Sequence, residues 1–226
     1  CAVGFPFLRE GTTPQGAYLS RIAMFITLEG PDGSGKTSQV NDLADYLRTL
    51  ERNVYVTREP GGSPISTQVR AILMDLDNKA MHPRTETLLF CAARAQHVEE
   101  VIRPHLAAGE IVLCDRYADS TLAYQGYGHG NDLDDLRTLL DFTTGGLKPN
   151  LTILFDISSE DGLKRRRTGG GEWNRLDDYA LAFHRKVRQG YHALASQEPD
   201  RWATIDASCC PEDVQAELRR VITDRL

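Results

Sequence analysis

Short apolar runs alternate with longer segments of helical period along most of the chain. Five runs are typical of β-strands: 25–29, 54–57, 111–114, 151–155 and 203–205. Between the first two runs, apolar residues recur at intervals of three and four, at Val40, Leu43, Ala44, Leu47 and Leu50. This spacing is typical of one buried helix face. The same period at 88–98, 136–140 and 214–222 predicts three further helices.

This alternation predicts an α/β domain with a five-stranded parallel sheet and helices on both faces. In such a sheet, ligands bind at the carboxyl ends of the strands. The domain is expected to span 24–226, because Met24 opens the first apolar run. Residues 1–23 show no clear period and are predicted to be an extension that does not belong to the fold.

Composition narrows the function classes. The chain has 226 residues and a net charge of −6, which argues against the broad basic surface of a non-specific nucleic-acid binder. No apolar run approaches the roughly 20 residues of a membrane-spanning helix, and the first 23 residues do not resemble a secretory signal. The odd number of cysteines, five without regular spacing, favours a reducing compartment. We therefore expect a cytoplasmic protein that binds neither nucleic acid nor membranes.

One motif points to phosphate binding. Residues 30–37, with the sequence GPDGSGKT, match GxxxxGK[ST] at every fixed position and lie between the first predicted strand and the first predicted helix. This is the context that identifies a P-loop. The predicted ATP-binding residues are Gly30, Pro31, Asp32, Gly33, Ser34, Gly35, Lys36, Thr37 and Ser38. Backbone N–H groups would surround a phosphate, Lys36 would supply a charge, and the Thr37 hydroxyl would bind Mg²⁺.

Other charged groups follow predicted strands. Arg58 opens an Arg-Glu-Pro-Gly-Gly segment after the second strand, and Asp115 and Arg116 follow the third. A basic run at 164–167 precedes three glycines, as a mobile lid would require. A guanine-reading NKxD motif is not completed at 78–81, where the fourth residue is Met81. These features favour a small-molecule kinase over a GTP-driven switch.

The ordered set of motifs resembles bacterial thymidylate kinase over residues 24–226. The set consists of the P-loop, the segment after Arg58, Leu88-Leu89-Phe90 with Arg94, Asp115-Arg116-Tyr117, the Ser120 to Gly126 segment and the basic lid at about 164–174. The resemblance implies a three-layer P-loop NTPase fold and transfer of the γ-phosphoryl group of ATP to dTMP, giving dTDP and ADP in dTTP synthesis. It also implies Mg²⁺ and a homodimer.

The resemblance also implies a role for each matching residue. Asp32 would hold the sugar 3′-hydroxyl, Arg58 and Arg116 the acceptor phosphate, and Asp115 the Mg²⁺ together with Thr37. The base would stack on Phe90, meet Arg94 at its edge, and lie against Thr121 and Gln125, while Tyr124 would crowd a 2′-hydroxyl. The catalytic residues would be Lys36, Arg116, Arg165 and Arg167.

Several alternatives stay open at this point. The chain could be a kinase for another nucleoside monophosphate or for a deoxynucleoside, or an ATP-binding regulatory protein without turnover. Arg166 is expected to point away from the phosphate if the basic run is extended. Asp156 could lie near the metal or cap the helix that begins near Ser159. His97, His129 and His184 are assigned no role.

Overall fold

The computed structural model describes residues 23–169 and 173–226. Its five strands form one parallel sheet in the order β2-β3-β1-β4-β5, which confirms the predicted fold class. The strands are β1 Met24–Glu29, β2 Val54–Arg58, β3 Ile111–Asp115, β4 Leu151–Asp156 and β5 Trp202–Asp206. The extension predicted at 1–23 lies outside the described residues, apart from Ala23, as do residues 170–172 of the predicted lid.

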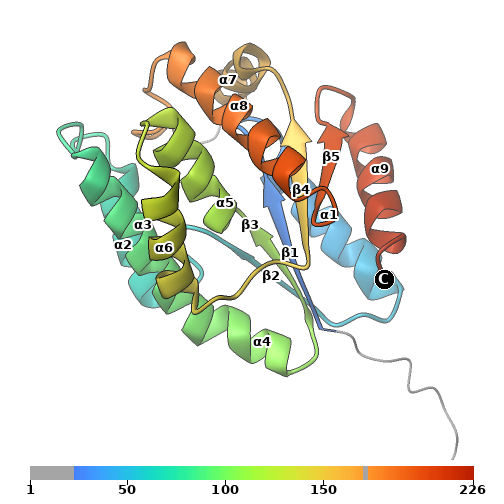
Figure 1. Ribbon diagram of the computed structural model, residues 1–226. Helices are drawn as coiled ribbons and strands as arrows, with labels where there is room; N and C mark the ends of the chain where they lie inside the picture. Colours follow the sequence, from blue (N-terminus) through green and yellow to red (C-terminus); the bar gives the residue numbers. More distant parts are fainter. Residues whose placement is uncertain (1–22, 170–172) are drawn as a thin grey trace, which may run out of the picture.

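Helices cover both faces of the sheet (Figure 1). They are α1 Lys36–Thr49, α2 Pro64–Met74, α3 Pro83–His97, α4 Arg103–Ala107, α5 Ala118–Thr121, α6 Leu133–Thr144, α7 Ser159–Thr168, α8 Leu181–Gln197 and α9 Pro211–Thr223, with π-helical segments η1 Val98–Ile102 and η2 Leu122–Gly128. In the part of the chain that the structure describes, no helix is both long and apolar enough to cross a membrane.

Apolar clusters lie on both faces of the sheet, because successive residues of a strand point to opposite faces. On one face, Ile26 and Leu28 of β1 share a core with residues of α1 and α9, such as Leu43 and Leu218. On the other face, Phe25 packs in a cluster with Tyr117 and residues of η1. The sheet is therefore the middle of three layers, and its carboxyl edge is left for a site.

Two of the predicted helix faces need correction. Leu50 is 43% exposed, because α1 ends at Thr49 and Leu50 lies past its last turn. In α3 the predicted apolar face is turned outward at Leu88, which is 57% exposed. The buried face of α3 instead carries charged side chains, including Glu86 and Arg94. Periodicity gives the wrong face here because these charges are buried with partners from other elements.

Candidate active site

A cavity of about 570 Å³ opens at the carboxyl ends of the strands, as expected for this class of sheet. The predicted site residues that line it are Asp32, Gly33, Gly35, Lys36, Thr37, Ser38, Arg58, Phe90, Asp115, Arg116, Thr121, Tyr124, Gln125 and Arg165. Five other predicted residues, Gly30, Pro31, Ser34, Arg94 and Arg167, are not among its lining residues. Most of the predicted site is thus brought to one place from five separate stretches of chain.

The P-loop connects β1 to α1 around the ammonium group of Lys36. This Nζ donates to the carbonyl oxygens of Gly30 and Pro31 and to Ser34 Oγ, at 2.9–3.0 Å. Burial lowers the pKa of Lys36 to about 8, and the charge of Arg116 acts in the same direction. Lys36 therefore still carries its charge at neutral pH, at the amino end of a helix, where anions are favoured.

Thr37 and Asp115 form a pair of oxygen donors beside Lys36. Thr37 Oγ1 donates to Asp115 Oδ2 at 2.6 Å, and both residues line the cavity. Hard oxygen ligands suit Mg²⁺, which protein sites often hold through only one or two side chains and substrate phosphates. Among the described residues, no cluster of three or more His, Cys, Asp or Glu side chains offers a dedicated metal cage. The pair therefore fits a nucleotide-bound Mg²⁺.

Arg116 is held in place at the wall of the cavity. Its backbone is left-handed, with φ +70°, a conformation that is uncommon for a side chain of this size. Its Nη2 donates to Asp32 Oδ1 at 2.7 Å and to Tyr124 OH at 3.1 Å. Burial by itself raises the pKa of Asp32, but the charges of Arg116 and Lys36 lower it to about 2. Asp32 is therefore ionised at neutral pH.

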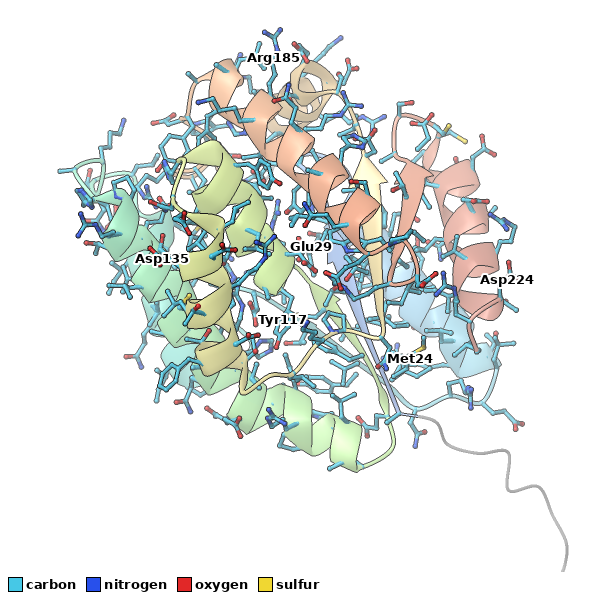
Figure 2. The ribbon with its side chains drawn as sticks, viewed as in Figure 1. Met24, Glu29, Tyr117, Asp135, Arg185 and Asp224 are labelled. Atoms are coloured by element: carbon cyan, nitrogen blue, oxygen red, sulfur yellow. The ribbon has the colours of Figure 1, made fainter. Side chains whose placement is uncertain are left out.

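Glu29 is a buried carboxylate that sequence reasoning missed. It ends β1 inside the molecule, between α5 and α8 (Figure 2). It accepts hydrogen bonds from Tyr117 N at 2.7 Å, Ser120 Oγ at 2.5 Å and Tyr191 OH at 2.9 Å. Burial raises its pKa to about 7, and the charge of Asp119 adds to the rise. An acid at the end of an apolar run, directly before the P-loop, was the available signal.

A second arginine joins Arg58 at the cavity wall. Arg70 of α2 lines the cavity and donates from Nη1 to the Pro60 carbonyl oxygen at 3.1 Å. Burial lowers its pKa to about 10, and the charge of Arg58 lowers it further. A lone arginine in a helix gave no sequence signal, but repulsion between these two cations identifies a place where an anion would be favourable.

Arg94 does not reach the cavity. Its side chain is 2% exposed, and its three guanidinium nitrogens donate to Glu59 Oε2, Thr121 Oγ1 and the Tyr117 carbonyl oxygen at 2.7–3.0 Å. It therefore supports the cavity-lining Thr121 from behind. His97, to which the sequence assigned no role, lies 3.0 Å from Glu59 Oε1 and 2.7 Å from Thr57 Oγ1. Both residues tie α3 to the segment after β2.

The basic run at 164–167 lies within helix α7, so the run is not extended and the condition under which Arg166 would point away from the phosphate is not met. Its acidic first turn and its cap by Ser158, which accepts from Asp161 N, favour a helix here. Arg165 and Arg166 both line the cavity. Arg165 donates to the Ala207 and Ser208 carbonyl oxygens, and Arg166 pairs with Asp177. Arg167 instead lies over the Trp173 ring, 5.5 Å from its centre.

Asp156 takes neither of the two roles considered for it. It pairs with Arg188 at 2.7 Å and lies 3.0 Å from His192 Nε2, both on α8. Hydrogen bonds from Arg188 lower its pKa against the effect of burial. Ser158, not Asp156, caps α7. Asp156 thus holds α8 on the end of β4.

Comparisons with known proteins agree with this geometry. A family model described as Thymidylate kinase matches residues 28–218, a stretch that contains every residue lining the cavity. A protein named thymidylate kinase from Roseiflexus castenholzii is 49% identical over 213 residues, covering 89% of this chain and 93% of that protein. Another from Thermomicrobium roseum is 51% identical over 203 residues, covering 90% and 96%. The crystal structure of thymidylate kinase from Ehrlichia chaffeensis matches with a TM-score of 0.73 and 34% identity, covering 89% of this chain and 99% of that one.

Proposed function

The chain belongs to the thymidylate kinase family, which transfers the γ-phosphoryl group of ATP to dTMP, and we propose that its cavity carries out this reaction with the residues described above. The P-loop would bind the donor phosphates. Lys36 would contact the β- and γ-phosphates through its buried ammonium group. Thr37 and Asp115, whose oxygens lie 2.6 Å apart, would hold Mg²⁺, which neutralises charge on the same phosphates.

The acceptor would bind between β2, β3 and α3. Arg58, Arg70 and Arg116 all line the cavity and would hold the acceptor phosphate. Asp32 and Tyr124, joined by a 2.6 Å hydrogen bond, would meet the sugar, so a 2′-hydroxyl would find little room. Phe90 would stack on the base, with Thr121 and Gln125 along its polar edges.

No catalytic base is required for this transfer. A phosphate monoester has its second pKa near 6, so the acceptor is already a nucleophilic anion at neutral pH. The chain must instead cancel repulsion between two polyanions and hold them in line. Lys36 and the cavity arginines supply that positive charge. Arg165 and Arg166 of α7 would approach the transferring group when the lid closes and excludes water.

The observation that carries this proposal is that one cavity is lined by two groups of charged and polar residues. Lys36, Thr37 and Asp115 form the group for the donor phosphates, and Arg116 and Asp32 form the group for the acceptor. We would test it by mixing the protein with Mg-ATP and a panel of nucleoside monophosphates and deoxynucleosides, measuring ADP release. We expect turnover with dTMP above all other acceptors. ADP release that is independent of acceptor, or fastest with a deoxynucleoside, would reject the proposal.

We also propose a homodimer formed through α2, α3 and α6, which lie side by side in Figure 1. Large apolar side chains are exposed on all three helices: Ile65 (52%), Ile72 (49%), Leu88 (57%) and Phe142 (85%). Exposed apolar groups gathered on one side of a molecule are typical of association surfaces. The cytoplasmic location stays a prediction from the sequence.

A further inference from the structure

Glu86 is a carboxylate of α3 with no solvent exposure. Its Oε1 accepts from Gln125 Nε2 at 2.8 Å and lies 3.0 Å from His129 Nε2. Its Oε2 accepts from Tyr179 OH at 2.8 Å and pairs with Arg175 Nη2 at 2.6 Å. Both oxygens therefore have two partners, which come from η2 and its end on one side and from the segment before α8 on the other.

Glu86 can only accept hydrogen bonds at neutral pH. Burial by itself raises its pKa, but hydrogen bonds from His129 and Gln125 lower it to about 2. An ionised carboxylate has no proton to donate. The end of the Gln125 amide that faces Glu86 must therefore be the NH₂ group. The orientation of this amide thus follows from the charge of its partner.

This orientation decides which atom Gln125 offers to the cavity. Gln125 lines the cavity, as do Phe90 and Thr121. Gln125 Nε2 gives one of its two N–H groups to Glu86. No side chain among the described residues donates to Oε1, so Oε1 is the acceptor that the amide offers a ligand. The amide thus offers a hydrogen-bond acceptor at the wall that would contact the base.

We propose that Glu86 is a positioning residue that fixes the polarity of the Gln125 amide, so that the acceptor site reads a base with a ring N–H donor. Thymine and uracil have such a donor at N3, whereas N3 of cytosine is an acceptor and would face Gln125 Oε1 without a proton between them. This inference rests on the proposed function, because it assumes that the acceptor base lies against Gln125.

The rest of the cluster keeps Glu86 from turning away. Arg175 also donates from Nε to the Leu73 carbonyl oxygen at 3.0 Å and from Nη1 to Tyr179 OH at 2.8 Å. Glu86 is therefore held from η2 and its end and from the segment before α8, and its partner Arg175 is itself bonded to α2. A carboxylate that cannot rotate holds the Gln125 amide in one orientation, which a neutral residue could not do.

The test compares kcat/KM for dTMP and dCMP in the wild type, Glu86→Gln and Tyr179→Phe. Glu86→Gln can donate as well as accept, so the Gln125 amide is free to turn. We expect the dTMP to dCMP ratio to fall by about 10-fold or more, partly through a gain with dCMP, because a site built around one hydrogen-bond pattern discriminates strongly. Tyr179→Phe removes the donor to Oε2 and the acceptor of Arg175 Nη1 but leaves the contact of Oε1 with Gln125 in place, so the ratio should stay within about 2-fold. An unchanged ratio in Glu86→Gln would overturn the inference.

A second measurement does not depend on the folding of the Glu86 variant. Wild-type protein should bind N3-methyl-dTMP at least about 10-fold more weakly than dTMP, because the methyl group replaces the donor. Binding of dUMP, which keeps N3–H, controls for other changes to the base and should stay within about 10-fold of dTMP. Equal binding of dTMP and its N3-methyl analogue overturns the inference while leaving dTMP phosphorylation intact. Absence of dTMP turnover in the wild type rejects the proposed function and the inference together.

Discussion

Buried carboxylates around the cavity differ in their charge state because their partners differ. Asp32 and Glu86 face cations and several donors, which lower both pKa values to about 2. Among the described residues no cation forms an ion pair with Glu29, and burial raises its pKa to about 7 although the charge of Arg116 acts the other way. Near neutral pH the cavity therefore combines fixed charges, which would hold ligands and neighbours, with one carboxyl group that still titrates.

The raised pKa of Glu29 predicts a pH dependence of stability. Between its ordinary pKa of 4.5 and about 7, the folded protein binds this proton more tightly than the unfolded chain. The free energy of unfolding should therefore fall as pH rises through this window, by about 3 kcal/mol from this group. Glu29→Gln should lose that slope, as measured by urea denaturation between pH 5 and pH 8.

Glu217→Gln is the matched control for this measurement, because Glu217 is a partly exposed glutamate of α9 that does not line the cavity. A plot of its free energy of unfolding against pH should run parallel to that of the wild type between pH 5 and pH 8. If the Glu29→Gln curve also runs parallel to the wild type, the carboxyl group of Glu29 does not titrate as proposed.

At the scale of elements, α7 packs closely against the P-loop where two glycines, Gly33 and Gly162, meet. A Cβ on Gly33, where φ is +77°, would overlap the carbonyl oxygen of Gly162, and a Cβ on Gly162 would come within 2.5 Å of the Asp32 carbonyl oxygen. The missing side chains thus let the lid helix touch the loop that carries Asp32. A P-loop arginine at position 33 would not fit this arrangement.

Gly162→Ala should therefore destabilise the protein although Ala is the better helix former. Helix propensity alone favours Ala by about 1 kcal/mol, but backbone overlap with Asp32 should cost about 1–3 kcal/mol. We expect a net loss of stability in urea denaturation and a higher KM for ATP. Thr168→Ala, at an exposed position of the same helix, should change neither quantity appreciably. A Gly162→Ala protein that is more stable than the wild type would contradict the prediction, because the backbone would then have moved to accept the methyl group at little cost.

The arginines of α7 should differ in their effect on kcat, depending on whether their side chains line the cavity. The Arg165→Ala/Arg166→Ala double variant should lower kcat by roughly 10³, because both side chains line the cavity and such an arginine stabilises charge in the transition state. The KM for dTMP should change little, since the contact forms chiefly in the transition state. Arg167→Ala, whose guanidinium lies on Trp173, should keep kcat within a few-fold. The opposite pattern would restore Arg167 as the catalytic lid residue.

At the scale of the whole molecule, the proposed dimer surface is testable through Phe142. This side chain is 85% exposed on α6, so Phe142→Asp should leave the folded monomer intact. A buried charge in an interface should cost about 2 kcal/mol or more, roughly 30-fold in the dimer dissociation constant. Sedimentation would measure this shift. Leu50→Asp, at an exposed apolar position at the end of α1, should not change the dimer. A wild type that is monomeric at micromolar concentration would contradict the proposal.

Much of the fold and the donor site could be predicted from the sequence, because their signals are local. The P-loop residues are contiguous, and short apolar runs followed by helical periods indicated a parallel sheet. The acceptor site was harder to predict from the sequence. Arg70 and Glu86 carry no motif of their own, and α3 was assigned the wrong buried face because its charged residues are paired across space.

The sequence by itself determined the strands, the P-loop and the residue types at the ends of the strands, because each depends on neighbours a few positions away. Tertiary structure alone decided which of these groups meet. Thr37 and Asp115 are 78 positions apart, and Gln125 and Glu86 are 39 apart. They come together only because sheet order and helix packing bring them together. A buried charge, moreover, is stable only beside partners that the rest of the fold supplies.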